Sequence, residues 1–417
     1  MSEIVNRSAV LVGVAERSAD LPAAQSSLDE LARLLDTAGG EVFARVIQIK
    51  STFDPRTCIG SGKVAEIAAL CRDGGAGLVV FDFELSPAQI RNLEEEIGGD
   101  VSVIDRSMLI LDIFALHATS GEGKLQVELA QLKYSAPRLT GQGTSLSRQG
   151  GGIGSRGPGE SKLETDRRHL KERIRALEGE LREMERNRLV MRRQRDRSGL
   201  PKVAIVGYTN AGKSTLLNAL TDAGVLSEDK LFATLDPTTR KLTLPSGESV
   251  LLTDTVGFIR KLPHHLIEAF KSTLDEVRYC DILMIVSDIS DPEAEEHLRV
   301  TESVADELGA KEKPRLYVYN KCDRIAGLSH AAPSENTVAV SAKEGRGLDL
   351  LLSAIEKILH AQKTDCRLLL PYTEQGRLSE LYRDYAVLSV EYREDGILAV
   401  ARLDEKGRGA FSAFLLQ

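Results

Sequence analysis

A glycine-rich turn carries residue types and spacing that fit phosphate binding. Residues 207–214 read Gly-Tyr-Thr-Asn-Ala-Gly-Lys-Ser, follow the apolar run 203–206 and precede a helical pattern at 215–220. In that context, glycines let backbone N–H groups wrap phosphates at a helix N-terminus. Lys213 is expected to reach the β- and γ-phosphates, and the Ser214 hydroxyl to ligate Mg²⁺. We therefore assign phosphate binding to Gly207, Tyr208, Thr209, Asn210, Ala211, Gly212, Lys213, Ser214 and Thr215.

A second motif, DxxG, follows the apolar run 250–252. An acid at the end of that strand can hold Mg²⁺ through water, and the glycine N–H can sense the γ-phosphate. DxxG alone is common and non-specific. Together with the first motif it adds Asp254, Thr255, Val256 and Gly257 to the predicted nucleotide site, with Lys213 and Gly257 as catalytic candidates.

Two further motifs define which base is bound. Asn-Lys-Cys-Asp at 320–323 and Ser-Ala-Lys at 341–343 each follow an apolar run. The Asp323 carboxylate can accept two hydrogen bonds from guanine N1–H and N2–H₂, which adenine does not offer. A P-loop kinase or ATPase explains the first two motifs but not these. The sequence thus predicts a GTP/GDP site that includes Asn320, Lys321, Cys322, Asp323, Ser341, Ala342 and Lys343.

Three other glycine-rich segments do not make a second nucleotide site. Gly60-Ser-Gly-Lys63 and Gly121-Glu-Gly-Lys124 have Thr57 and Ala118 where a P-loop needs its first glycine. Residues 152–157 match GxGxxG, but no strand precedes them, so we reject a dinucleotide site.

The composition is that of a globular protein. The chain has 417 residues, 42% of them hydrophobic and 28% charged, and its five cysteines form no CxxC pair. Sparse cysteines fit a reducing compartment. We find neither a signal peptide nor a run of about 18 apolar residues that could span a bilayer, so the sequence predicts a cytoplasmic protein with no stable membrane insertion.

The order of apolar and helical patterns predicts an α/β fold. We expect an N-terminal α/β domain (1–120), a helix, glycine-rich loop and basic coiled-coil helix (121–199), a P-loop domain (200–362), and a small α+β C-terminal domain (363–417). The P-loop domain should have a mostly parallel sheet with helices on both faces. Expected N-terminal strands are 9–14, 42–49, 78–81 and 101–104, with helices near 28–35, 64–71, 87–97 and 108–116.

The charge is unevenly distributed. The chain carries a net charge of −8, but residues 138–202 hold 17 Lys and Arg against 9 Asp and Glu, a local +8 that leaves −16 for the rest. A basic segment in an acidic chain can direct binding to a polyanion, although a charge run by itself is more often a solvated surface. The glycine-rich stretch 141–160 inside it is expected to be a flexible loop carrying Arg148 and Arg156.

A long helix is expected at 161–197. Its apolar residues follow a heptad seam: Leu163, Leu170, Ile174, Leu177, Leu181, Met184 and Met191. This seam must pack on a partner, either the helical stretch 126–134 or another chain. The upstream helix looks short for that purpose, yet pairing within the chain is simpler and predicts a monomer.

Several segments resemble the HflX family of TRAFAC-class GTPases. They are residues 81–93, 103–106 with 110–114, 126–132, 157–162 with 164–168, and 232–240. The resemblance covers nearly the whole chain and is weakest beyond residue 366. It implies an N-terminal α/β domain, a glycine-rich loop with a two-helix coiled coil, a GTPase domain and a small C-terminal domain. It also implies binding to the large ribosomal subunit and a role in dissociating or rescuing stalled ribosomes, often under stress.

The same resemblance places the switch I threonine at Thr234, with Thr238 and Thr239 as alternatives. The Thr234 hydroxyl would complete Mg²⁺ coordination only with GTP bound, which makes Thr234 a metal ligand and a catalytic candidate. The resemblance adds Phe232, Ala233, Thr234, Leu235 and Asp236 to the predicted GTP contacts.

Phe258 follows Gly257 at the position where many GTPases carry a glutamine that orients the attacking water. A phenyl ring can neither donate nor accept that hydrogen bond. We expect slow intrinsic hydrolysis that the ribosome accelerates by ordering the switches, an effect of about 10³–10⁵ in other systems.

Three functional hypotheses remain at this point. The leading one is a GTPase that binds rRNA of the large subunit through Arg148 and Arg156. A second is a regulatory switch that recruits a protein partner without RNA contact. A third, an ATP-dependent RNA remodeller, requires ATP turnover that survives Lys213→Ala.

Overall fold

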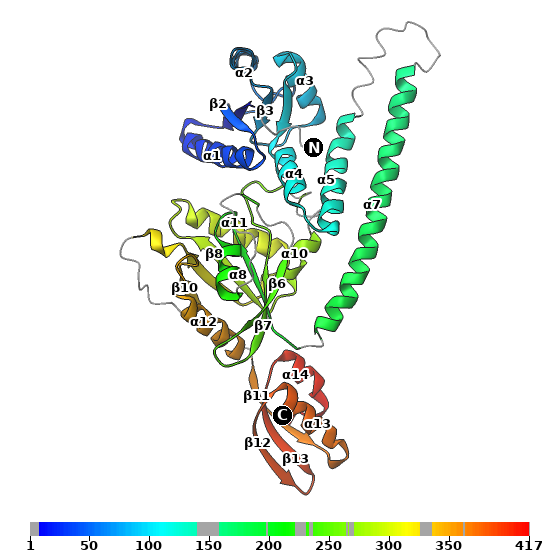
Figure 1. Ribbon diagram of the computed structural model, residues 1–417, viewed down its shortest axis with the longest axis vertical. Helices are drawn as coiled ribbons and strands as arrows, with labels where there is room; N and C mark the ends of the chain where they lie inside the picture. The colour runs from blue at the N-terminus through cyan, green and yellow to red at the C-terminus, as the bar shows by residue number, and fades with distance from the viewer. Residues whose placement is uncertain are drawn as a thin grey trace.

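The computed structural model describes residues 8–139, 158–196, 199–221, 231–232, 237–263, 266, 271–325, 336–361 and 363–416. Three sheets follow one another along its long axis, and a pair of long helices lies beside them (Figure 1). We call these parts the N-terminal unit (8–117), the helical hairpin (121–196), the central unit (202–361) and the C-terminal unit (364–416). The arrangement confirms the predicted α/β fold class.

The N-terminal unit is built on a four-stranded parallel sheet of order β2-β1-β3-β4. The predicted strands are found within one residue at their ends, and the predicted helices are found as well, although the first begins at Leu21, seven residues before the predicted stretch 28–35. Its elements are β1 (Ser8–Ala15), α1 (Leu21–Thr37), β2 (Glu41–Ile49), α2 (Ser61–Gly74), β3 (Leu78–Phe81), α3 (Pro87–Ile97), β4 (Ser102–Asp105) and α4 (Arg106–His117).

Local sequence explains where two of these helices begin. The Ser86 hydroxyl accepts a hydrogen bond from the Gln89 N–H, and the Gln89 side-chain oxygen accepts one from the Ser86 N–H. Pro87 follows at the first position of α3, where its fixed φ already suits a helix. Asp105 caps α4 by accepting from the Met108 N–H at 3.0 Å.

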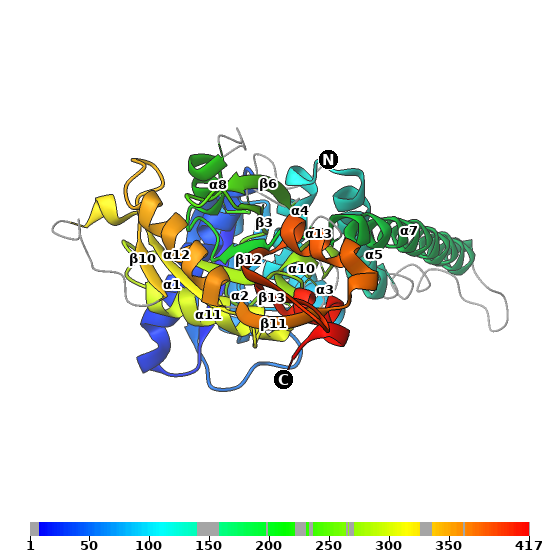
Figure 2. The same cartoon turned by 90° about the horizontal axis from the view of Figure 1, so that it is seen from below.

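The helical hairpin consists of α5 (Gly121–Leu139), which packs on the N-terminal unit, and α7 (Pro158–Asp196), which lies beside α5 and projects outward (Figures 1 and 2). Two inter-helix ion pairs, Arg173 with Glu128 and Lys133 with Glu178, both have N–O distances of 2.7 Å. Leu177 of the predicted seam is fully buried. Around Leu177, the seam therefore packs on α5 within the chain.

Two expectations about this region were wrong in detail. The upstream helix is not short, because α5 spans nineteen residues where the apolar pattern indicated only 126–134. The C-terminal boundary predicted for the glycine-rich loop, residue 160, was also too late, because α7 already begins at Pro158. Proline is favoured in the first turn of a helix, where its missing N–H costs nothing, and this outweighs the neighbouring glycine. Residues 140–157, including Arg148 and Arg156, lie outside the described residues.

The central unit holds a six-stranded sheet of order β10-β9-β8-β5-β7-β6, in which only the β6–β7 pair is antiparallel. This confirms the mostly parallel sheet expected for the P-loop domain. Its described elements are β5 (Lys202–Gly207), α8 (Lys213–Thr221), β6 (Thr238–Thr243), β7 (Ser249–Asp254), α10 (Lys271–Arg278), β8 (Ile282–Asp288), α11 (Ala294–Glu307), β9 (Arg315–Asn320), β10 (Thr337–Ala339) and α12 (Leu348–Ala361).

The C-terminal unit is an antiparallel three-stranded sheet of order β11-β13-β12 with helices packed on it. It confirms the expected α+β character. Its elements are β11 (Thr364–Leu370), α13 (Gln375–Asp384), β12 (Ala386–Arg393), β13 (Gly396–Leu403) and α14 (Glu405–Ala410).

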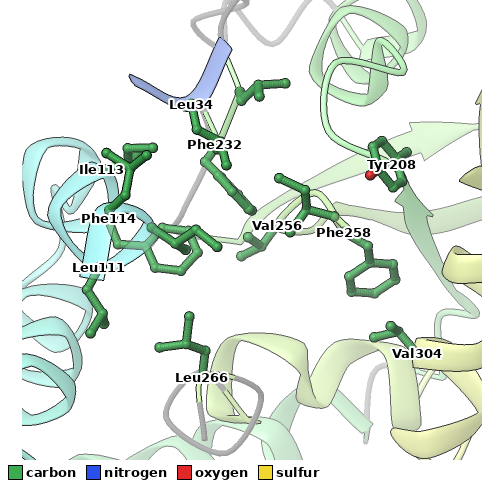
Figure 3. Close-up of a cluster of buried hydrophobic side chains, with 14 of the residues drawn as sticks. Leu34, Leu111, Ile113, Phe114, Tyr208, Phe232, Val256, Phe258, Leu266 and Val304 are labelled. Atoms are coloured by element: carbon green, nitrogen blue, oxygen red, sulfur yellow. The ribbon is translucent and has the colours of Figure 1, made fainter. Parts of the chain in front are cut away.

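One apolar core is shared by the N-terminal and central units. The cluster joins Leu34, Ile113 and Phe114 to Phe232, Val256, Phe258 and Leu266 (Figure 3). The rings of Phe114 and Phe232 meet edge to face with centroids 4.8 Å apart. Burial of this kind is the main force that holds two sheets together. Within the described ranges, no helix is both long and apolar enough to cross a membrane.

Candidate nucleotide-binding site

The phosphate-binding turn lies between β5 and α8, at the carboxyl end of the central sheet. Its glycines are required by close contacts. A Cβ on Gly207 would lie 2.2 Å from the Val286 carbonyl oxygen, and one on Gly212, whose φ is +90°, would lie 2.2 Å from the Asn320 amide nitrogen. Any side chain at either position would force the turn out of its conformation. The turn is thus shaped by its neighbours as well as by its own sequence.

Lys213 is buried in the turn and points at its carbonyl groups. Its Nζ donates to the Gly207 oxygen at 3.2 Å and to the Tyr208 oxygen at 2.9 Å. Burial lowers the pKa of the Lys213 ammonium to about 8, against the opposing effect of the Asp254 carboxylate. A phosphate beside Nζ would favour the charged form, because an opposite charge nearby offsets the desolvation. Lys213 is therefore held where phosphate oxygens can be neutralised.

Ser214 and Asp254 form a pair of oxygen donors suited to a hard cation. The Ser214 hydroxyl donates to Asp254 Oδ2 at 2.6 Å, while Asp254 Oδ1 is buried and has no hydrogen-bond partner. Burial raises the pKa of Asp254, which Lys213 and the Ser214 hydroxyl partly counteract. A buried carboxylate oxygen without a partner is costly, and a cation would satisfy it. The donor set fits Mg²⁺, which prefers carboxylate, hydroxyl and water oxygens and would neutralise phosphate charge.

Asn320 joins the phosphate turn to the residues expected around the base. Its amide donates to the Ala211 oxygen at 2.9 Å, and its Oδ1 accepts from the Ala342 N–H at 3.0 Å. Lys321 adds a second link, donating to the Asn210 oxygen at 2.8 Å and pairing with Asp288 at 2.8 Å. Three of the four motifs are therefore tied together by direct hydrogen bonds.

Asp323 is presented as an ionised acceptor. The Ser341 hydroxyl donates to Asp323 Oδ1 at 2.6 Å, and this bond is the main cause of a lowered Asp323 pKa. The neighbouring Cys322 is buried, and Lys343 is exposed. A fixed carboxylate beside the 341–343 turn has the chemistry that guanine N1–H and N2–H₂ require.

The DxxG motif places its glycine directly on the phosphate turn. A Cβ on Gly257 would lie 2.8 Å from Thr209 Cγ2 and 3.0 Å from Lys213 Nζ. Thr255 is turned inward and donates to the Ile205 oxygen at 2.7 Å. Val256 is buried in the shared core. Gly257 is thus close to the ammonium that should meet the γ-phosphate.

Phe258 points away from the phosphate turn. Its side chain is 1% exposed and packs in the shared core near Val304 (Figure 3). Its backbone stays with the turn: the Phe258 N–H donates to the Gly207 oxygen at 3.0 Å, and its oxygen accepts from the Thr209 N–H at 2.8 Å. The position that carries a glutamine in many GTPases therefore serves as a core anchor.

The predicted switch I contacts are only partly described. Ala233, Thr234, Leu235 and Asp236 lie outside the described residues. Phe232 is buried against Phe114 of α4, and its φ is +56°. The two alternative threonines begin β6, where the Thr239 hydroxyl is 2.9 Å from the Thr253 hydroxyl.

Contacts with the N-terminal unit were missed by the sequence reading. The Tyr208 hydroxyl donates to Glu30 of α1, and Lys261 Nζ donates to Asp82 Oδ2 at 2.5 Å. One signal was present: Glu30 interrupts the buried face of α1, between Leu28 and Leu31. An acid on the apolar face of a helix implies a buried partner.

Four family models match successive parts of the chain. They are described as "GTP-binding GTPase N-terminal" (residues 25–115), "GTP-binding GTPase Middle Region" (117–195), "50S ribosome-binding GTPase" (202–321) and "HflX C-terminal domain" (326–409). The last model includes α12, which the structure places in the central unit.

Curated relatives match along most of their length. A protein named "GTPase HflX" from Lacrimispora saccharolytica is 52% identical over 93% of this chain and 92% of its own. Another from Escherichia coli is 43% identical over 89% of this chain and 88% of its own. Among solved structures, a GTP-binding protein from Sulfolobus solfataricus in complex with GDP is 28% identical, with a TM-score of 0.44, over 84% of this chain and 98% of its own.

Proposed function

Since the chain belongs to the HflX family of GTPases and is a GTP-hydrolysing enzyme, we propose that it acts on the large ribosomal subunit, using GTP to dissociate or rescue stalled ribosomes. The observation that carries this proposal is the combination of a guanine-type nucleotide site with the projecting helix α7, which carries exposed basic residues. The family-model description of the central unit, "50S ribosome-binding GTPase", supports the same partner. The proposed setting is the cytoplasm, where ribosomes work.

At the nucleotide, each motif has one proposed task. Lys213 neutralises the β- and γ-phosphates, and Ser214 holds Mg²⁺ together with Thr234 when GTP is bound. Gly257 reports the γ-phosphate through its N–H, while Asp323 selects guanine. Phe258 cannot orient water, so hydrolysis is proposed to be slow in the free protein and faster on the ribosome.

The proposed RNA contact is the helical hairpin and the glycine-rich segment that joins its helices. Arg167, Lys171, Arg175 and Arg186 are exposed along α7, whereas the inter-helix ion pairs use Arg173, Glu178 and Arg188 of this helix. A row of exposed guanidinium and ammonium groups on a helix that stands clear of the sheets can follow a phosphate backbone. Arg148 and Arg156 would extend this row, so they remain proposed RNA contacts.

The test is co-sedimentation of the full chain with purified large subunits and a non-hydrolysable GTP analogue. We expect binding to weaken steeply with salt, and the double variant Arg167→Glu, Lys171→Glu to lower affinity by about tenfold or more at fixed salt. The double variant Arg148→Ala, Arg156→Ala is expected to weaken binding as well. Charge reversal of exposed Arg299 and Arg383, away from the hairpin, is the matched control.

Three results would overturn the proposal. If neither hairpin variant differs from the Arg299 and Arg383 control, the hairpin is not the RNA contact. If the chain with bound GTP analogue stays in light fractions with a protein partner, it is a recruiting switch. ATP turnover that survives Lys213→Ala would point instead to an ATP-dependent RNA remodeller.

A further inference from the structure

The phosphate turn touches the N-terminal unit through one tyrosine. The Tyr208 hydroxyl donates to Glu30 and accepts from the Arg260 N–H at 2.8 Å. Its ring stacks on His297 of α11, with centroids 3.8 Å apart and planes 13° apart. Burial and the Glu30 charge both raise the pKa of Tyr208, so the hydroxyl remains a donor at all physiological pH values. A residue of the phosphate turn is thus fixed by an acid from another unit.

The segment after the DxxG motif is bound to the same unit by two cations. Lys261 Nζ donates to Asp82 Oδ2 at 2.5 Å and to the Ser27 hydroxyl oxygen at 3.1 Å. Arg260 donates to the Ser26 hydroxyl oxygen at 3.3 Å and pairs with Glu293 at 2.9 Å. Together these contacts hold residues 260–261 against α1 and the end of β3.

Lys261 makes its contact from an unfavourable backbone conformation. Its φ is +51°, in the left-handed region that non-glycine residues rarely enter because of steric strain. Such strain persists only where surrounding contacts fix it. Of the contacts that Lys261 Nζ makes with Ser27 and Asp82, the one to Asp82 Oδ2 is the shortest, so this ion pair is placed to hold the backbone in that shape.

The buried guanidinium of Arg106 holds the Asp82 and Glu30 carboxylates in place. Arg106, at the start of α4, is 1% exposed; it bonds Asp82 Oδ1 at 2.7 Å and also bonds Glu30. Two acids then face the cations Arg106 and Lys261. Removing one partner of a buried pair leaves an uncompensated charge, so the set has one favoured arrangement.

Only a few residues separate this network from the catalytic groups. Gly257 lies against Thr209 and Lys213 Nζ, and the Phe258 backbone is hydrogen-bonded to both sides of Tyr208. Residues 257–261 are therefore a short bridge with one end on the phosphate turn and the other on the N-terminal unit. A shift at Lys261 must be absorbed within four residues of the predicted γ-phosphate sensor.

We propose that Asp82 and Glu30 are positioning residues for GTP: through Lys261 and Tyr208 they hold residues 257–261 so that the Gly257 N–H is preset for the γ-phosphate. The inference rests on the nucleotide placement proposed above, and it concerns the free protein, with no ribosome required. It predicts that the N-terminal unit raises affinity for GTP over GDP. By linkage, a γ-phosphate then strengthens the contact between the two units.

Lys261 is the best position to test, because its side chain is 52% exposed and its loss leaves Asp82 paired with Arg106. We expect Lys261→Ala to weaken a non-hydrolysable GTP analogue about five- to tenfold while GDP affinity stays within about twofold. Lys261→Arg should restore most of the difference. Lys241→Ala, an exposed lysine of β6, is the matched control and should change neither affinity.

A double-mutant cycle with Asp82→Asn sharpens the test. If the ion pair carries the effect, Lys261→Ala should add little in the Asp82→Asn background. If Asp82→Asn does not fold, Lys261→Arg, which keeps the positive charge, is compared with Lys261→Met, which removes it; only Lys261→Met should lose the preference for the GTP analogue. A ratio of analogue to GDP affinity that is unchanged, or that rises, in Lys261→Ala would overturn the proposal. Failure of the wild-type chain to bind GDP would instead overturn the nucleotide placement.

Discussion

The two ends of the nucleotide site are built in different ways. At the guanine end, Asn320, Asp323 and Ser341 find their partners within the central unit. At the γ-phosphate end, Tyr208 and Lys261 find theirs in the N-terminal unit. On the nucleotide placement proposed above, base recognition belongs to the central unit, whereas we propose that the response to the third phosphate depends on the position of the N-terminal unit.

The largest effect is expected at the guanine end. Asp323→Asn removes a charged acceptor for guanine and should weaken GDP and the GTP analogue alike, by on the order of 100-fold. The amide of the new side chain can donate to the 2-oxo group of xanthine, so xanthosine nucleotides should bind better than guanosine nucleotides. The measurement is equilibrium titration of the variant with GDP, the GTP analogue and the corresponding xanthosine di- and triphosphates. A loss confined to the triphosphate would break the comparison between the two ends.

Phe258→Gln tests whether the side chain at position 258 serves to pack the shared core or to assist GTP hydrolysis. A polar amide in a site that is 1% exposed should cost about 3 kcal/mol of unfolding free energy. Intrinsic GTP hydrolysis should rise by no more than about twofold, because the side chain points into the core and not toward the phosphates. Denaturant unfolding and single-turnover hydrolysis are the measurements. An acceleration above about tenfold would contradict this placement.

Tyr208→Phe is the mildest change and separates stability from coupling. Loss of the hydroxyl should lower the free energy of unfolding by about 1–2 kcal/mol. It should also lower the preference for the GTP analogue over GDP. Tyr317→Phe is the matched control, since its hydroxyl donates to Glu302 at 2.7 Å within the central unit. It should lower thermal stability slightly without changing that preference. Equal effects of both variants on the preference would indicate that the N-terminal contact has no special role.

Much of the fold could be predicted because its signals are local. The phosphate turn is a continuous run of eight residues between a strand and a helix, and its glycines can be read directly. The expected N-terminal strands were found because they are short apolar runs rich in Val and Ile, a composition that favours strands over helices. Both ends of α5 and the start of α7 were missed because a glycine or a proline near a helix end does not by itself decide where the helix stops or starts.

What the sequence by itself determined is the chemistry: a phosphate turn, a candidate magnesium ligand and a guanine-selective carboxylate, each carried by residues close together in the chain. What only the tertiary structure decided is how these groups are held. Lys261 and Asp82 are 179 positions apart, and Tyr208 and Glu30 are 178 apart. Such contacts leave no periodic pattern in the sequence, because they arise when two sheets bury a common core and the charges at its edge must find partners.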